Sequence, residues 1–213
     1  MGRIKQWRNG QWQDVSVKQY RNGQWVEVDV KQWRNGKWEN LTSQQYTKTW
    51  DCIWTQTYRK SGTKRTDYRA EKLCQGQYVT EPWGIMRSLC GFDDGSRIRN
   101  ELAGAKIIDV KLYLYAEHWY YYSGGTVYIG YHNHSSKPDT FSESKYRAVT
   151  ATYSARGQGK WIDLPNSFAE GIRDGDYKGI SIFANSTSMN YYGIFSGVHD
   201  GNNKPKLKIT YEK

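Results

Sequence analysis

Consecutive aromatic residues are the most prominent side chains that could contact a ligand. The segment Glu117-His-Trp-Tyr-Tyr-Tyr-Ser-Gly-Gly125 contains four aromatic residues in a row. Successive side chains of a strand point to opposite faces, so four consecutive aromatics cannot all face the interior. We therefore expect a loop with at least two exposed rings. By analogy with base stacking, an exposed ring stacked on a sugar or a base contributes about 1–3 kcal/mol. The candidate binding residues here are Trp119, Tyr120, Tyr121 and Tyr122.

An alternative interpretation of this segment is an aromatic rim that packs against the N-terminal sheet or another subunit. A second polar and aromatic segment, Asn190-Tyr-Tyr192, lies near Ser186-Thr-Ser188 and has the chemistry of a glycan contact. Tyr191 and Tyr192 are therefore further glycan-binding candidates, although the same composition also suits a loop that only packs on its own domain.

A third candidate is a basic stretch that could neutralise phosphate groups. The alternative is a solvated surface, which is the usual role of such runs. The stretch comprises Arg59, Lys60, Lys64, Arg65 and Arg69.

Motifs of catalysis and of metal binding are not found in the sequence. There is no Gly-x-Ser-x-Gly, His-Glu-x-x-His, phosphate-binding glycine loop or dinucleotide fingerprint. Asp174-Gly-Asp176 lacks the spacing of a calcium loop. Cys52, Cys74 and Cys90 show no Cys-x-x-Cys spacing, so we expect buried free thiols, with a single disulfide as the alternative. The sequence predicts a protein that is not an enzyme and has no catalytic residues, metal or cofactor.

Charge and composition restrict the partners. The 213 residues carry a formal net charge of +10, which favours nucleic acid, phosphate-bearing wall polymers or acidic glycans. No apolar run approaches the ~18 residues of a membrane-spanning helix, so we expect no membrane partner. The start of the chain lacks an apolar segment, and no secretory signal is predicted. Ten Trp and 18 Tyr indicate a folded chain with an aromatic core.

A repeated phrase opens the chain. It occurs at Lys5–Trp12, Lys18–Trp25 and Lys31–Trp38, with a period of 13 residues, and each copy contains Asn-Gly. Asn-Gly suits the positive φ angles of a two-residue type I′ hairpin turn. Residues 1–46 are therefore predicted to form a four-stranded antiparallel meander of Asn-Gly hairpins. Its strands are expected at about 2–8, 11–21, 24–34 and 37–46.

The turn geometry also predicts the register of this meander. Trp7 should face Trp12, Trp12 should face Trp33, and Trp33 should face Trp38, with a second row of aromatics on the same side. This face has two interpretations: a flat surface for stacking sugars or bases, or an interface with neighbouring subunits in an oligomer. Its residues are Trp7, Trp12, Trp25, Trp33, Trp38, Tyr20 and Tyr46.

The remaining residues, 47–213, contain seven or more short apolar runs separated by Gly-rich or Asx-rich connections. This spacing is typical of an antiparallel β-sandwich. Helix is scarce, and a turn or two is expected at 167–172, where Phe168 and Ile172 share one face. The predicted fold class is all-β, with the N-terminal meander followed by the sandwich.

Several motifs in this region follow one another in an order that resembles a known family. They are Arg87-Ser-Leu-Cys-Gly-Phe-Asp93, the strand from Leu102 to Tyr115, Trp161-Ile-Asp-Leu-Pro165, Gly179-Ile-Ser-Ile-Phe183 and Lys204-Pro-Lys-Leu-Lys-Ile-Thr-Tyr211. This order is similar to the DNRLRE-type carbohydrate-binding module over about 80–213. The resemblance implies a jelly-roll-like antiparallel β-sandwich. The chain departs from the family pattern at Cys90-Gly91 and Asp109-Val110, and the motifs describe the core rather than a ligand site.

The opening repeat resembles the tandem Trp-x-Asn-Gly-x-Trp phrases of minor structural and tail proteins in phages of Gram-positive bacteria. Together, the two resemblances imply a tail-associated virion protein that is assembled in the host cytoplasm and acts extracellularly. Its expected partners are cell-surface polysaccharide or wall teichoic acid and other virion proteins, in a homo-oligomer. The main alternative is a purely structural decoration or connector subunit whose aromatic faces are protein interfaces. Nucleic-acid binding rests on charge alone and is not expected.

Overall fold

A computed structural model describes residues 4–28, 30–34, 36–40, 43–78 and 82–213. The chain divides into two units, one of residues 1–46 with 212–213 and one of residues 47–211. Both consist mainly of antiparallel strands, so the predicted all-β class is confirmed. No helix in the described residues is long and apolar enough to cross a membrane.

The repeat unit folds into the predicted hairpins. Asn9 and Gly10 have φ of 49° and 78°, and Asn22 and Gly23 have φ of 50° and 83°, as a type I′ turn requires. Gly36 has a φ of 80° in the third turn, whose Asn35 lies outside the described residues. The strands are β1 (Lys5–Arg8), β2 (Gln11–Asp14), β3 (Lys18–Arg21), β4 (Gln24–Glu27), β5 (Lys31–Arg34) and β6 (Lys37–Asn40).

The predicted four-stranded meander is wrong, because these strands form three separate two-stranded sheets. The pairs within each hairpin are as predicted: Trp7 faces Trp12, Tyr20 faces Trp25, and Trp33 faces Trp38. The predicted pairs between hairpins, Trp12 with Trp33 and Trp25 with Tyr46, do not form. Tyr46 instead belongs to a strand of the sandwich.

The reason lies in the connectors. An Asn-Gly turn fixes the pairing of the two strands that it joins, but it does not fix pairing across the next connector. Val15 and Val17 are the first and last residues of a three-residue connector that is not a strand, and both are half-buried. Each repeat therefore closes its own hairpin. The predicted strand ends at residues 2–3 and 41–42 lie outside the described residues.

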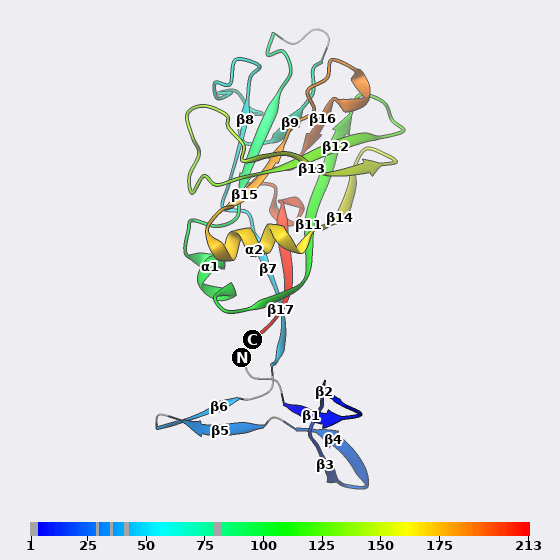
Figure 1. Cartoon of the computed structure of the whole chain (residues 1–213). Helices are drawn as coiled ribbons and strands as arrows, with labels where there is room; N and C mark the ends of the chain where they lie inside the picture. Colours follow the sequence, from blue (N-terminus) through cyan, green and yellow to red (C-terminus); the bar gives the residue numbers. More distant parts are fainter. Residues whose placement is uncertain (1–3, 29, 35, 41–42, 79–81) are drawn as a thin grey trace. The chain divides into compact units, whose positions relative to one another are not determined.

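The second unit is the predicted β-sandwich (Figure 1). One sheet has the order β13-β12-β15-β10-β8, and the other has the order β7-β17-β11-β16-β9, with β14 also paired to β11. The strands are β7 (Gln45–Asp51), β8 (Trp54–Tyr58), β9 (Leu73–Gln75), β10 (Arg87–Gly91), β11 (Lys106–Trp119), β12 (Gly125–His132), β13 (Lys145–Tyr153), β14 (Gln158–Leu164), β15 (Gly179–Ile182), β16 (Gly193–Phe195) and β17 (Lys206–Glu212).

The core forms between the two sheets because alternate apolar side chains of each strand point inward. Leu112 and Leu114 of β11 are fully buried with Ile129 of β12 and Ile180 of β15. Helix α2 (Asn166–Asp174) contains the predicted helical turn. The short elements are α1 (Arg97–Leu102), which lies near α2 at one end of the sandwich (Figure 1), and the 3₁₀ turns η1 (Met189–Tyr191) and η2 (Gly201–Asn203).

All three cysteines are free and buried, as predicted. Burial raises the pKa of the Cys90 thiol, and hydrogen bonding with Cys52 raises it further. The thiolate is the reactive form of cysteine, so Cys90 is held in its unreactive state.

Candidate functional site

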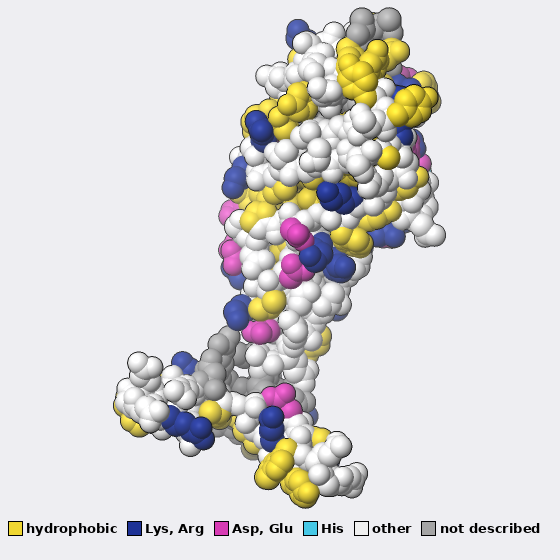
Figure 2. All heavy atoms as spheres, turned by 90° about the vertical axis from the view of Figure 1, so that its right-hand side faces the viewer, with side chains coloured by type: hydrophobic (Ala, Val, Ile, Leu, Met, Phe, Trp, Pro, Cys, Tyr) yellow, Lys and Arg dark blue, Asp and Glu magenta, His cyan; other side chains and the backbone are white. Residues whose placement is uncertain are grey.

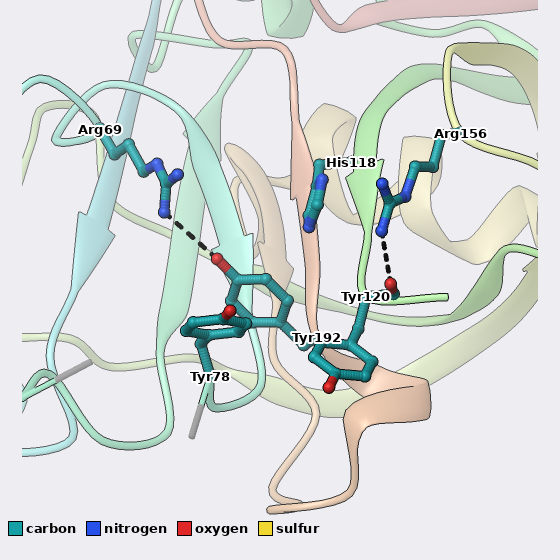
Figure 3. A pocket seen from close by; sticks show the side chains of 6 residues that line it. All are labelled: Arg69, Tyr78, His118, Tyr120, Arg156 and Tyr192. Carbon is teal, nitrogen blue, oxygen red and sulfur yellow. Dashed lines mark hydrogen bonds between the residues drawn. The ribbon is translucent and has the colours of Figure 1, made fainter. Parts of the chain in front are cut away.

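A cavity of about 280 Å³ lies at one edge of the sandwich (Figure 3). It is built where β11, β16 and β9 lie side by side in the six-stranded sheet. His118 is near the end of β11, and Tyr192 directly precedes β16. The other lining residues come from connections: Arg69 before β9, Tyr78 after it, Tyr120 after β11, and Arg156 between β13 and β14.

Three tyrosine rings form a continuous wall of this cavity. The Tyr78 ring lies 5.2 Å from that of Tyr192 and 5.9 Å from that of Tyr120, measured between centroids. Tyr192 also meets the His118 ring edge-on at 5.7 Å. Such an aromatic wall can stack on an apolar face of a sugar ring, while nearby polar groups bond its hydroxyls.

Two arginines reach the cavity from different segments. Arg69 donates a hydrogen bond from Nη1 to the Tyr192 hydroxyl at 3.2 Å. Arg156 donates from Nη2 to the backbone carbonyl of Tyr120, and its guanidinium lies 3.9 Å from the centroid of the Tyr122 ring. Both hydrogen bonds are drawn in Figure 3. Stacking occupies the flat face of the Arg156 guanidinium and leaves N–H groups at its edge to bind a ligand.

His118 lies between these two arginines in Figure 3. Burial lowers its pKa, and the positive charges of Arg156 and Arg69 lower it further. The imidazole is therefore neutral at pH 7, with one nitrogen that can donate and one that can accept a hydrogen bond. A neutral imidazole beside two guanidinium groups offers polar contacts for hydroxyl groups.

The predicted aromatic segments contribute part of this site. Tyr120 and Tyr192 line the cavity. Tyr121 packs edge-on against Tyr120 with centroids 4.8 Å apart, and Tyr122 is 81% exposed beneath Arg156. Tyr191 lies outside the lining, where its hydroxyl is 3.1 Å from that of Tyr128.

The prediction that Trp119 is an exposed binding residue is wrong, because its side chain is fully buried. Strand β11 continues to Trp119 where a loop was expected, and its pairing with β16 shifts between Ala116 and His118. This bulge changes the inward–outward alternation and turns the indole into the core. There it contacts the rings of Tyr153 and Phe195, with centroids 5.8 and 5.4 Å away.

Glycine at position 193 makes room for this indole. A Cβ atom there would lie 2.7 Å from the Trp119 ring, which is closer than real contacts allow. We expect Gly193→Ala to reduce the free energy of unfolding by about 1–3 kcal/mol, measured by urea denaturation. The loss should be smaller in a Trp119→Phe background, where the ring is smaller. An equal loss in both backgrounds would contradict this explanation.

The residues of the predicted basic patch have different surroundings in the structure. Arg65 is 3% exposed and pairs with Asp67 at 2.5 Å. The guanidinium groups of Arg59 and Arg65 lie over the Trp83 ring at 4.4 and 5.1 Å. Lys64 forms an ion pair with Asp139 at 2.8 Å, while Lys60 is exposed. Of the five residues, Arg69 lines the described part of the cavity.

Sequence reasoning missed Tyr78, His118 and Arg156. His118 lies within the aromatic segment that drew attention, but it was not named as a candidate. Arg156 lies in a turn, Ser154-Ala-Arg-Gly157, with no local signal of a binding role. The strand order β11-β16-β9 brings Tyr78 to His118, and the pairing of β14 with β11 brings Arg156 there; no local pattern reveals either.

A second, smaller hollow of about 130 Å³ is lined by Tyr68, Glu71, Lys72, His199 and Asp200. Its charges are paired within the protein. Lys72 binds Asp200 at 2.6 Å and Glu117 at 2.7 Å, and Glu71 binds Lys137 and His199. A hydrogen bond from Lys137 is the main cause of the lowered pKa of Glu71. These groups are therefore engaged with one another rather than open to a ligand.

No protein-family model matches the chain, and no curated protein matches it in sequence.

Proposed function

We propose that this protein is a non-enzymatic glycan-binding protein whose sandwich holds a cell-surface polysaccharide or wall teichoic acid. The observation that carries the proposal is the cavity in which the tyrosine wall meets two arginines. In a sugar site, aromatic rings stack on the C–H faces of the ring, and a few placed polar groups fix its orientation. Tyr78, Tyr120 and Tyr192 supply the first feature, and Arg69, Arg156 and His118 supply the second.

The proposal extends to a place in a phage virion. The Asn-Gly repeat resembles phrases of phage tail proteins, and we propose that the hairpins attach the sandwich to other virion proteins. The protein would be assembled in the host cytoplasm and would meet its glycan on the cell surface. The charge of +10 supports an acidic wall polymer as the ligand.

The test is binding of the full chain to purified Gram-positive walls, before and after removal of teichoic acids, over a salt series. We expect saturable binding that persists at about 500 mM salt, because stacking contacts are not screened by ions. Binding that disappears at moderate salt would reduce the interaction to charge attraction. Failure to bind any wall preparation would overturn the proposal.

Replacing Tyr120 with alanine should weaken wall binding about fivefold or more, because stacking of one ring contributes about 1–3 kcal/mol. The ring is 36% exposed, so Tm should change little. Tyr146→Ala is the matched control, since Tyr146 is 47% exposed and is not among the residues that line the cavity. The affinity is measured from binding isotherms and the Tm from thermal unfolding of the same preparations. Equal losses of wall affinity in the two variants would show that Tyr120 does not belong to the binding site.

A second candidate function is favoured by the hairpins. Each hairpin exposes one aromatic pair, with centroids 5.3–5.4 Å apart and exposed fractions of 56–68%. Figure 2 shows hydrophobic side chains on the surface of the hairpins. Repeated exposed aromatics suit a protein interface, as in a structural virion subunit. The mass of the full chain in solution, from light scattering, tests this function. An oligomer that dissociates when Trp12, Trp25 and Trp38 are replaced with alanine would support it.

A further inference from the structure

The cavity has a positive lining. Arg69 and Arg156 approach it from opposite sides of His118 (Figure 3), and the described lining residues include no carboxylate. The second hollow has a different character, since Lys72 there is bound by both Glu117 and Asp200. The charge of Arg69 also acts on the Asp67 carboxylate, whereas the charges of the hollow are balanced among its own residues and Glu117.

Arg156 carries the clearest unbalanced charge. Within the described part of the chain its contacts are the Tyr120 carbonyl and the Tyr122 ring, and it forms no ion pair with an acidic side chain. A carbonyl and an aromatic face orient a guanidinium without neutralising it. The protein therefore holds a cation in a defined position at the cavity and leaves its charge for a ligand.

His118 lies between the two arginines among the residues that line the cavity (Figure 3). Its pKa is lowered mainly by burial, but the fields of Arg156 and Arg69 both contribute. Two guanidinium groups from separate loops therefore act on the same imidazole, which lies between them in the lining. An anion placed in the cavity beside this imidazole would lie in the electrostatic field of both arginines.

We propose that the cavity selects glycans that carry an anionic group, a carboxylate or a phosphate, held between Arg69 and Arg156 while the sugar ring stacks on the tyrosines. This inference rests on the proposed function and specifies its ligand class. Guanidinium groups match the planar, two-oxygen geometry of both anions. The neutral His118 adds a hydrogen bond to the anion or to an adjacent hydroxyl.

Matched polymers test the inference with the full chain. The first pair of probes is a polyuronate and its carboxyl-reduced form. The second pair is cell walls that carry teichoic acid and the same walls after its removal. We expect at least one acidic polymer to bind tenfold or more tightly than its neutral counterpart. The pair that shows this difference distinguishes a carboxylate ligand from a phosphate ligand. Equal affinity within both pairs would overturn anion selection but retain the glycan site, whereas no binding to any probe would overturn both.

Variants of Arg156 test whether this residue causes the preference for the acidic polymer. Arg156→Gln should lower the affinity for the acidic polymer about tenfold and lower the affinity for its neutral counterpart by clearly less, so that the preference for the acidic polymer shrinks. Arg156→Lys should lose less, because it keeps the charge but not the planar fork. Arg147→Gln is the control: Arg147 also lies over a tyrosine, 4.0 Å from the Tyr128 centroid, and is not among the cavity residues. Equal effects of Arg156→Gln and Arg147→Gln would show a general charge effect and contradict the proposal.

Discussion

Replacing Trp119 with alanine should lower the free energy of unfolding by about 3–5 kcal/mol, the range for a large aromatic removed from a core. The indole is fully buried between Tyr153 and Phe195, and Gly125 and Gly193 leave it the space that a Cβ would fill. The surrounding strands are paired in a sheet, so they cannot collapse into the space that the ring leaves. Urea denaturation followed by circular dichroism measures the loss.

The neighbouring Tyr122 provides the control for this prediction. It lies three residues away and is 81% exposed, so Tyr122→Ala should change the free energy of unfolding by about 0.5 kcal/mol or less. A large loss of stability in the Trp119 variant and a small one in the Tyr122 variant would confirm that Trp119 is buried in the core and that Tyr122 is exposed. A stable Trp119→Ala protein that has lost glycan binding would contradict the structure and show that Trp119 is a binding residue.

Acid should destabilise the sandwich through His132. Burial is the main cause that lowers its pKa to about 3. The neutral ring is fully bonded: Nε2 donates to the Cys90 carbonyl at 3.1 Å, and Nδ1 accepts from the His134 amide at 3.1 Å. A proton on Nδ1 would face the hydrogen of that amide. The folded state therefore rejects a proton that the unfolded chain binds below its ordinary pKa of about 6.5.

The direction of the effect follows from this difference. Between about pH 6.5 and pH 3 the unfolded state binds more protons at this position, so the free energy of unfolding falls as pH falls. The slope approaches about 1.4 kcal/mol per pH unit at full effect. Glu143 acts in the opposite direction, because burial raises its pKa, and Asp67, with a lowered pKa, contributes at lower pH.

The variant His132→Gln isolates the contribution of the imidazole. Glutamine can donate to the Cys90 carbonyl and accept from the His134 amide, but it does not titrate. Urea denaturation of both proteins between pH 7 and 5 measures the difference in their free energies of unfolding. The carboxylates are the same in both proteins, so their contributions cancel in this difference. We expect the wild-type protein to lose stability more steeply than the variant. Parallel curves would contradict the buried neutral state of His132.

For the repeat, local sequence patterns predicted each hairpin but not the arrangement of the hairpins. Asn9-Gly10 and Asn22-Gly23 carry local information about a turn, and they were sufficient to predict each hairpin and its aromatic pair. The arrangement of hairpins depends on connectors such as Val15–Val17, whose conformation the turn does not determine. The prediction therefore succeeded inside each repeat and failed between repeats.

The candidate site shows the same division between local and long-range information. Tyr120 and Tyr192 were found because they belong to short segments rich in polar and aromatic residues. Trp119 was misplaced because a single bulge near Ala116 reverses which side of β11 faces the core. Tyr78 belongs to the site through the order of β11, β16 and β9, and Arg156 through the pairing of β14 with β11; local residue patterns encode neither of these long-range properties.

We attribute glycan binding to the tyrosine and arginine cavity rather than to the hairpins, and this proposal predicts different results for variants of the two surfaces. It is tested most directly by comparing full-length wild type, Tyr120→Ala/Arg156→Gln and Trp12→Ala/Trp25→Ala/Trp38→Ala for binding to Gram-positive cells. We predict that the cavity variant loses cell binding at unchanged Tm and that the hairpin variant keeps it. Binding retained by the cavity variant and lost by the hairpin variant would contradict the claim and place recognition on the exposed aromatic pairs.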